Sequence, residues 1–224
     1  MREFTSIFAV VLGLFVITSL SSTAQAQDFE GVIHYEVMGI SQQQTNSMPY
    51  MIKGNKGRIE MNTNGKMQAA MLFFPEESRR VIIMEAMNGY MEMPQQKSDD
   101  SSNNQSKMKA SLTGETKTIA GRECEVLRTE TPNNVIEACM AKGMGSFMMP
   151  QDPMGKSEAP AWAKELFSQN AMPLEVVEIQ NGNRTVQMKA TKIEEKTLSD
   201  DLFTIPDGYR DMSGMMKKMQ RGNQ

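Results

Sequence analysis

Few side chains in this chain could carry out acid–base or metal chemistry. His34 is the only histidine among 224 residues, which excludes every metal site that needs a pair of histidines. A Ser-His-Asp triad would have to use His34, but Gly143-Met-Gly-Ser-Phe does not place its serine between the two glycines of a nucleophile elbow. We expect His34 to lie with Glu36 on the polar side of a strand, at the surface.

Acidic doublets are the remaining candidates for acid–base work. Neighbouring residues in a strand point to opposite faces, so adjacent carboxylates make poor catalytic pairs and are typical of turns and strand ends. The chain also has no glycine-rich loop of the Walker or dinucleotide type. We therefore predict no catalytic residue, no cofactor and no enzymatic activity. The doublets are Glu76-Glu77, Asp99-Asp100, Glu194-Glu195 and Asp200-Asp201.

Methionine is unusually abundant, at 23 residues. Thioethers are soft ligands that suit Cu(I), and five methionines follow Cys139 closely. Alternatively, methionine replaces leucine as an adaptable filler of a core or an apolar pocket. The methionines are spread over several predicted strands, which favours the filler and leaves Cu(I) binding as a minor hypothesis. The five are Met140, Met144, Met148, Met149 and Met154.

The two cysteines, Cys124 and Cys139, are predicted to form a structural disulfide. Residues 122–129 and 135–140 have the composition of strands, and Pro132-Asn133-Asn134 lies between them as a turn. A hairpin centred between Thr131 and Pro132 would place the two cysteines directly opposite each other, within bridging distance. A redox-active pair is the competing interpretation, but such dithiols usually have C-x-x-C spacing.

The first 26 residues have the pattern of a cleaved signal peptide. Arg2 supplies a positive charge, residues 7–17 are almost entirely apolar, and Ala24-Gln25-Ala26 matches an A-x-A cleavage site. The apolar run is shorter than the roughly 20 residues of a membrane-spanning helix. No cysteine near the cut could carry a lipid. We expect a periplasmic or secreted protein that does not span the membrane after cleavage, and export agrees with a disulfide.

Residues 27–224 are predicted to form a single domain. Strand signals run through almost the whole segment, interrupted at about 95–109 by a polar stretch that we expect to be a flexible loop. The net charge is −3 and the basic residues are scattered, which argues against binding nucleic acid. Tight turns, including Asn64-Gly65 and Asn88-Gly89, predict an antiparallel meander.

Two predicted strands, Met67–Phe74 and Val81–Met84, are apolar at odd and even positions, so both faces of the sheet should be covered there. A helix over 159–168 should cover one face, with Trp162, Leu166 and Phe167 on one stripe. Curvature of the sheet or a ligand would account for the other face. An apolar cavity would then lie near Met71, Phe73, Ile83 and Trp162.

Four motifs are distributed over the mature chain, namely Phe29-Glu-Gly-Val-Ile-His-Tyr, Gly57-Arg-Ile-Glu-Met, Thr116-Lys-Thr-Ile-Ala-Gly-Arg-Glu-Cys-Glu-Val and Phe203-Thr-Ile-Pro-Asp-Gly-Tyr. Together they resemble an exported bacterial domain-of-unknown-function family with a G-x-x-C signature (DUF4412). More distantly, the order of elements and the closing F-x-x-P-x-G-Y are similar to lipoprotein carriers of the LolA type. The resemblance implies a mainly β (α+β) fold, a strongly curved antiparallel half-barrel with one or two helices covering its concave face.

Three functions remain open at this point. The first is a non-catalytic binder of an apolar ligand, a lipid or an acyl chain, in the cell envelope. The second is a structural or partner-binding envelope protein whose interior is filled, with the partner unspecified. The third is the Cu(I) binder. A cavity of several hundred cubic ångströms would favour the first function over the second.

Overall fold

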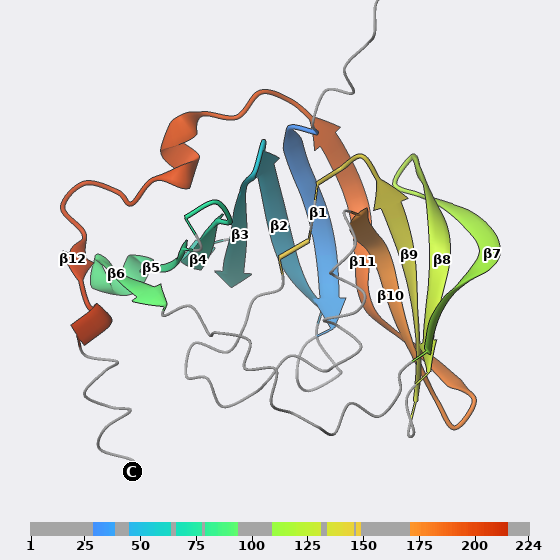
Figure 1. Ribbon diagram of the computed structural model, residues 1–224. Coiled ribbons are helices and arrows are strands. Elements are labelled where there is room, and N and C mark those ends of the chain that lie inside the picture. Colours follow the sequence, from blue (N-terminus) through green and yellow to red (C-terminus); the bar gives the residue numbers. More distant parts are fainter. Residues whose placement is uncertain are drawn as a thin grey trace, which may run out of the picture.

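The computed structural model describes residues 29–38, 45–63, 66–77, 79–93, 109–130, 134–145, 147–148 and 171–214. They form one large, curved, open sheet of twelve strands in the order β12-β6-β5-β4-β3-β2-β1-β11-β10-β9-β8-β7 (Figure 1). The strands are β1 (Gly31–Met38), β2 (Thr45–Lys53), β3 (Lys56–Thr63), β4 (Lys66–Phe74), β5 (Arg79–Met84), β6 (Gly89–Met93), β7 (Lys109–Ile119), β8 (Arg122–Glu130), β9 (Val135–Lys142), β10 (Ala171–Gln180), β11 (Asn183–Glu195) and β12 (Arg210–Asp211). Two 3-10 turns, η1 (Glu85–Met87) and η2 (Asp200–Phe203), complete the described elements.

The sheet consists of two antiparallel meanders that meet at the β1–β11 pair. Strands β1 to β6 each pair with the next strand, as do β7 to β11, and only β12 runs parallel to its neighbour, β6. The described turns β2–β3, β7–β8 and β10–β11 each contain two residues. The β10–β11 turn contains only Asn181 and Gly182, which have positive φ values of 52° and 81°, as the right-handed twist of a two-residue hairpin requires. The predicted antiparallel meander is thereby confirmed.

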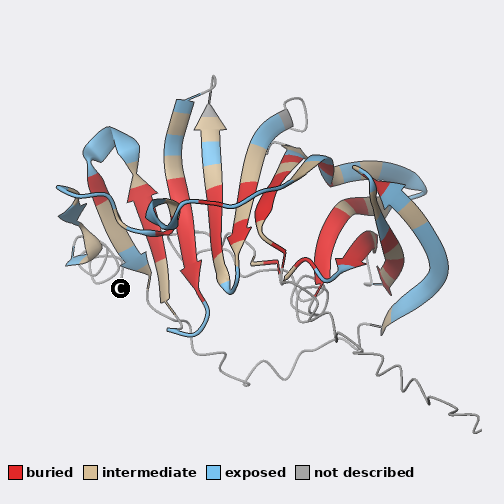
Figure 2. Ribbon diagram, turned by 90° about the horizontal axis from the view of Figure 1, so that it is seen from above, coloured by how far each residue is buried: buried red, intermediate tan, exposed pale blue. Residues whose placement is uncertain are grey.

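The main hydrophobic core lies on the concave face of this sheet. One row crosses six strands through residues that lie opposite each other in successive pairs, namely Ile33, Tyr50, Ile59, Met71, Ile82 and Met91. Figure 2 shows that buried residues occupy the middle of the strands. The edge strand β7 is mostly exposed. The curvature lets side chains from the two meanders contact each other across the interior.

The opposite, outer face of β4 and β5 is covered by the chain's own C-terminal run, residues 198–213, which we call the C-terminal strap. Ala70, Leu72 and Phe74 of β4 and Val81 and Ile83 of β5 form a separate buried cluster there. Ile205 and Tyr209 of the strap pack against this cluster. The apolar residues at both odd and even positions of β4 and β5 are therefore explained by two different covers, the concave core and the strap.

Polar contacts anchor the C-terminal strap to the outer face. Arg58 of β3 is only 7% exposed, forms an ion pair with Glu60 at 2.9 Å, and donates a hydrogen bond to the Leu202 carbonyl at 2.9 Å. Lys53 donates to the Leu198 carbonyl at 2.7 Å. The Tyr209 hydroxyl donates to a carboxylate oxygen of Glu85 at 2.6 Å. The strap is thus tied to β2, β3 and η1 as well as to the β6 edge.

On the outer face of the second meander, β7 to β11, the described residues form ion pairs. Glu137 of β9 accepts from Arg128 of β8 at 2.8 Å and from Arg184 of β11 at 2.6 Å. Partial burial opposes ionisation of Glu137, but the two guanidinium groups outweigh it and lower the pKa of this carboxyl. Glu175 lies between Lys117 and Lys189 in the same way. This face therefore carries carboxylates that are each held between two basic side chains.

Several expectations about the fold are refined by the structure. Cys124 and Cys139 are bonded, with a Cα–Cα distance of 5.2 Å, which confirms the predicted disulfide. The predicted register was wrong, because Cys139 lies opposite Val126 and the last pair before the turn is Glu130 with Val135. The four residues between Glu130 and Val135 are not part of the β8–β9 ladder. They include a proline and two asparagines, which favour a loop over a paired strand end. The bridge therefore joins Cys139 to a residue two positions before Val126, its direct partner in the ladder.

Other expectations fall on residues that the structure does not describe. The signal peptide, the helix over 159–168 and residues 95–108 of the polar loop expected at about 95–109 lie outside the described residues. Lys109, the last residue of that expected loop, is the first residue of β7. Within the described part of the chain, no helix is long and apolar enough to cross a membrane. The coarse fold, a mainly β domain with a disulfide and a curved sheet, stands as predicted.

Candidate functional site

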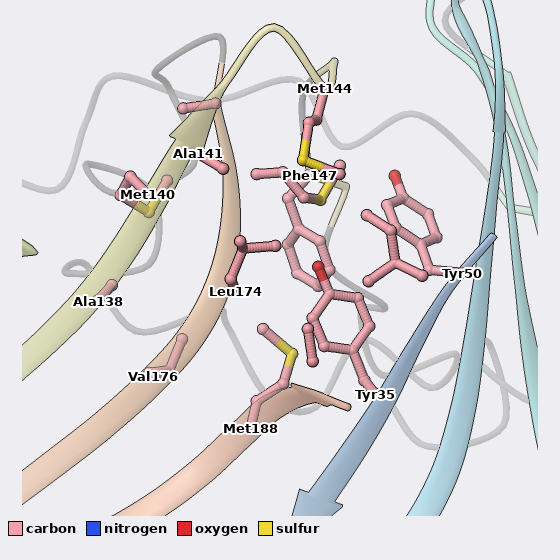
Figure 3. Close-up of a cluster of buried hydrophobic side chains, with 14 of the residues drawn as sticks. Tyr35, Tyr50, Ala138, Met140, Ala141, Met144, Phe147, Leu174, Val176 and Met188 are labelled. Atoms are coloured by element: carbon pink, nitrogen blue, oxygen red, sulfur yellow. The ribbon is translucent and has the colours of Figure 1, made fainter. Parts of the chain in front are cut away.

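The centre of the concave face brings two tyrosines opposite aliphatic residues of the other meander. Tyr35 of β1 and Tyr50 of β2 lie on one side, and Leu174 of β10 and Met188 of β11 on the other (Figure 3). All four are buried in the main cluster. Tyr35 and Tyr50 share the concave face with Ile33. Tyr50 lies opposite Ile33 in the β1–β2 pair, and Tyr35 follows Ile33 by two positions on the same strand.

Phe147 fills the space between these residues. Its ring is 4% exposed and contacts Tyr35 and Tyr50 edge-on, with centroids 6.1 Å and 5.3 Å away. Such edge-to-face pairs add about 0.5–1.5 kcal/mol to the energy of burial. Phe147 reaches this position because the chain leaves β9 through Gly143 and Gly145, whose φ values of 74° and 79° suit only glycine well.

The polar ends of the two tyrosines are satisfied within the protein. The Tyr35 hydroxyl donates to the Pro173 carbonyl at 2.9 Å, and the Tyr50 hydroxyl accepts from the Met148 backbone N–H at 3.2 Å. Burial raises the pKa of Tyr35 well above its ordinary value, and the neighbouring Tyr50 adds to the effect. Burial also raises the pKa of Tyr50. Both hydroxyls are therefore neutral at physiological pH, and the interior is apolar and uncharged.

A cleft of about 250 Å³ opens at the β4–β5–β6 end of the concave face. Phe73, Arg80 and Met93 lie opposite one another in adjacent strands, so their side chains share this face. Met148 forms another part of the wall. Because Phe147 precedes Met148, one segment both fills the aromatic centre and borders the cleft. The full lining is Phe73, Phe74, Pro75, Arg79, Arg80, Met93 and Met148.

The charged part of the cleft lining consists of two arginines. The Arg79 guanidinium lies 5.1 Å from the centroid of the Phe74 ring and forms ion pairs with Glu92 at 3.0 Å and Glu77 at 3.5 Å. Arg80 is half-buried beside Phe73. The described lining includes no acidic side chain. The cleft thus combines an apolar wall with guanidinium groups at the start of β5.

Gly57 of β3 allows the wall of the cleft to approach the sheet. A Cβ atom at Gly57 would lie 2.9 Å from the Met148 methyl carbon and 3.2 Å from the Tyr50 hydroxyl. Gly57 lies directly opposite Phe73 in the β3–β4 pair. The absence of a side chain there lets Tyr50 and Met148 lie over the strand, next to the cleft.

A second cleft, of about 330 Å³, is mainly polar. It lies beside the start of β1. Its lining includes Glu30, Arg122, Gly143 and the Glu195-Lys196-Thr197 run. Arg122 and Glu195, which both line it, form an ion pair with each other. Its charged residues are thus largely neutralised by their neighbours.

The structure brings together only some of the predicted site residues. Met71 and Phe73 lie in the main core on the concave face, and Phe73 lines the 250 Å³ cleft. Ile83 lies on the opposite face, under the C-terminal strap, and Ile82 takes the concave position beside Met71. A run that is apolar at every position gives no alternation from which the face could be chosen. Trp162 lies outside the described residues.

The residues that sequence reasoning missed are Tyr50, Arg80 and Phe147. Tyr50 and Arg80 follow from the register, since they share a face with Met71 and Phe73 once the pairs are known. Phe147 lies in a glycine- and methionine-rich stretch with no periodicity, which gave no signal for an inward position. The glycine pair at 143 and 145 was the available hint of an irregular turn.

The expected surface residues and metal candidates can be placed in part. His34 is partly exposed, with its Nε2 atom 3.5 Å from a carboxylate oxygen of Glu194. Among the described residues, no group of three or more His, Cys, Asp or Glu side chains could hold a metal ion. Met140 and Met144 are buried in the main core. Met149 and Met154 lie outside the described residues.

Comparison with known proteins gives a family and a distant likeness. Two crystal structures of PNGF-II, in space groups C2 and P21, are similar to this chain with a TM-score of 0.46 each and sequence identities of 16% and 15%. They cover 85% and 86% of this chain but only 32% and 33% of the PNGF-II chain, so this chain spans about a third of that protein. No curated protein matches it. The model of the family called domain of unknown function (DUF4412) matches residues 29–209, and the chain therefore belongs to that family.

Proposed function

We propose that this protein is an exported, non-catalytic binder of an apolar ligand, a lipid or an acyl chain, in the cell envelope. The observation that carries the proposal is the cleft beside Phe73, whose wall of Phe73, Met93 and Met148 continues into the apolar interior around Tyr50. Aromatic and methionine side chains provide a large and adaptable apolar surface. Among the residues of the lining that the structure describes there are guanidinium groups and no carboxylate, imidazole or thiol, a set that suits binding better than acid–base chemistry.

The proposal includes a half-barrel like that of the LolA-type carriers, with the helix over 159–168 as a lid. The curved sheet and its apolar concave face support this arrangement. A lid carrying Trp162, Leu166 and Phe167 would close the concave side over the ligand. The disulfide and the signal-like first 26 residues support the proposed periplasmic or secreted location.

A structural or partner-binding envelope protein is the second candidate, and the packing of Phe147 favours it. The contacts of Phe147 with Tyr35 and Tyr50 fill the centre of the concave face. The 250 Å³ cleft is slightly smaller than typical ligand pockets, which begin at about 300 Å³. A lipid carrier would have to move the segment 143–148 to accept a long chain. A structural protein with a filled core needs no such movement.

Mass spectrometry of organic extracts from protein purified without detergent separates the two candidates. A carrier should release a lipid in stoichiometric amount, and delipidated protein should then bind added lipid saturably with a rise in thermal stability. If folded protein releases no lipid and does not bind added lipid, the structural or partner-binding function becomes the better supported candidate.

A pair of variants on one strand localises the ligand. Phe73→Ala removes a side chain that lines the cleft, and Leu72→Ala removes an equally buried side chain on the opposite face. Both should destabilise the protein by about 2–5 kcal/mol. Under the proposal, Phe73→Ala also changes ligand affinity while Leu72→Ala does not. Equal effects on ligand binding would exclude the cleft as its site.

A further inference from the structure

Strand β7 forms the longer of the two edges of the sheet. It spans 11 residues, whereas β12 at the opposite edge spans 2 (Figure 1). β8 pairs with one side of β7, and no described strand pairs with the other side. Residues 111–116 and 118 are exposed. A long exposed edge offers its backbone N–H and C=O groups to a strand of another molecule.

An irregularity interrupts this edge near its middle. Leu112 and Thr116 are the paired residues on either side of it. Between them, residues 113–115 lie opposite Val126 alone, so β7 contains two extra residues there. Such a bulge bends its strand, increases the local twist and leaves the extra residues out of the ladder. We call residues 113–115 the β7 bulge.

The β7 bulge is held in place by its own contacts. The Thr113 hydroxyl donates to the Val126 carbonyl at 3.1 Å and accepts from the Glu115 N–H at 3.1 Å. Gly114 has a φ value of 79°, at which a residue with a Cβ atom is strained. The Glu115 N–H is thereby used inside the bulge. The bulge is therefore a defined structure that divides the edge in two.

We propose that the β7 bulge prevents two copies of this chain from pairing edge to edge along β7. The bulge leaves two regular segments of four residues each, 109–112 and 116–119. Each is shorter than an average strand of about 5–6 residues, and the bend between them keeps both from lying along one straight partner. Natural sheets protect exposed edges by such bulges.

The partner that the bulge excludes is a second copy, because β7 is complementary to itself once the bulge is removed. Without Thr113 and Gly114, the strand reads Lys-Ala-Ser-Leu-Glu-Thr-Lys-Thr-Ile. Two such strands, antiparallel about Thr116, place Glu115 of each copy opposite Lys117 of the other. Opposite charges across a strand pair stabilise it. In the protein as it stands, the bond between the Glu115 N–H and Thr113 keeps Glu115 out of such a ladder.

Deletion of Thr113 and Gly114 tests the proposal. It leaves one residue opposite Val126 and so restores a regular ladder with β8. We expect the wild-type chain to sediment as a monomer, and the deletion variant to shift to a dimer as its concentration rises. Sedimentation velocity of both proteins measures the shift, and thermal melting shows whether the deletion variant folds cooperatively.

A charge reversal on the deletion variant tests the register. Glu115→Lys would place two lysines opposite each other in the dimer, so it should return the deletion variant to a monomer. Glu123→Lys is the matched control, because it makes the same charge change at an exposed position of β8, which has strands on both sides. The dimer should survive this control substitution.

Thr113→Val is a milder variant that keeps the length of the chain. It removes both hydrogen bonds of the Thr113 hydroxyl and supplies a residue that favours an extended backbone. Sedimentation equilibrium should show an association constant about tenfold above that of the wild-type chain, which corresponds to about 1.4 kcal/mol. This variant decides the question if the deletion variant does not melt cooperatively.

Three results would overturn the proposal. The first is a folded deletion variant that stays monomeric at every concentration, or, if that variant does not fold, an unchanged association constant for Thr113→Val. The second is a dimer of the deletion variant that Glu115→Lys leaves intact. The third is a wild-type dimer that Glu115→Lys dissociates, since the edge would then pair despite the bulge.

Discussion

The ring of Phe147 meets the ring of Tyr50 edge-on, with centroids 5.3 Å apart and planes inclined by 72°. The two residues come from different meanders, because Tyr50 is part of β2 and Phe147 follows β9. Met148, the next residue, donates its N–H to the Tyr50 hydroxyl and lines the cleft. Tyr50 therefore holds the segment between the cleft and the apolar centre. Under the proposed function, the stability of this contact decides how much room a ligand can find.

Phe147→Ala should lower the free energy of unfolding by about 3–5 kcal/mol, because it removes a buried aromatic ring and its two edge contacts. Under the proposed function it should also tighten the binding of long lipid chains, since Phe147 directly precedes Met148, which lines the cleft. Chemical denaturation and ligand titration measure the two effects. Leu112→Ala is the control, because this side chain is 57% exposed and its loss should change stability by about 0.5 kcal/mol or less. A loss under 1 kcal/mol for Phe147→Ala would contradict the packing.

Gly57→Val should destabilise the protein by about 1–3 kcal/mol, because its side chain would collide with Met148 and Tyr50. Met148→Ala should relieve part of this loss. A double-mutant cycle by urea denaturation measures the coupling between the two sites, which we expect to exceed 0.5 kcal/mol in magnitude by the usual behaviour of residues in contact. Strictly additive effects would show that Met148 does not lie over Gly57.

The sequence was a good guide to local structure and a poor one to contacts between distant segments. Asn181-Gly182 specified its hairpin, because its two residues readily adopt the positive φ values that the turn needs. The position of Ile83 could not be predicted, since β5 is apolar on both faces and only the partner Ala70 shows which face it shares. In a strand without polar–apolar alternation, the face to which each side chain points is fixed by the register. The register in turn depends on pairing with the neighbouring strands.

The cover of the outer face was also beyond sequence reasoning. Phe203 and Tyr209 were recognised as parts of a closing motif, but nothing local indicated that this run crosses β3, β4 and β5. The contact depends on Arg58, which reaches the Leu202 carbonyl 144 positions later in the chain. Such contacts between distant segments have no periodic signal, so the sequence left the second face open between curvature of the sheet and a ligand.

Breaking the contact between Arg58 and the C-terminal strap should destabilise the protein. Arg58→Met removes the ion pair with Glu60 and the hydrogen bond to Leu202, and leaves both acceptors partly buried without this partner. We expect a loss of about 2–4 kcal/mol, less than for a fully buried pair because Glu60 is partly exposed. The strap should also become more sensitive to limited proteolysis near Leu202. Arg210→Met, at an exposed position of the same strap, serves as the control.

Removal of the disulfide should weaken the fold without abolishing it. Cys124 and Cys139 are 15 positions apart, and closing a loop of this length stabilises by about 3 kcal/mol in the chain-entropy model. The double variant Cys124→Ala/Cys139→Ala should therefore melt at a lower temperature with a cooperative transition. Peptide mapping without reductant should recover the two cysteines as one linked pair from wild-type protein. Two free thiols in oxidised, exported protein would contradict the bridge.

Alkaline pH should destabilise the protein through its buried tyrosines. Burial raises the pKa of Tyr35, and its neighbour Tyr50 adds to the rise; burial likewise raises the pKa of Tyr50. In the unfolded chain both groups ionise near their ordinary value of about 10. Their contribution to stability is therefore complete below about pH 10 and is lost as the pH rises above it toward the raised folded values, because the unfolded state releases protons first.

Each of these tyrosines should steepen the loss of stability by up to about 1.4 kcal/mol per pH unit above pH 10. Urea denaturation at a series of alkaline pH values measures the slope, and phenolate absorbance should rise in step with unfolding. Tyr35→Phe should reduce the slope while costing about 1 kcal/mol at neutral pH, because the Pro173 carbonyl loses its donor. A wild-type slope equal to that of Tyr35→Phe would show that Tyr35 ionises as readily in the folded protein as in the unfolded chain, which burial in the main core does not allow.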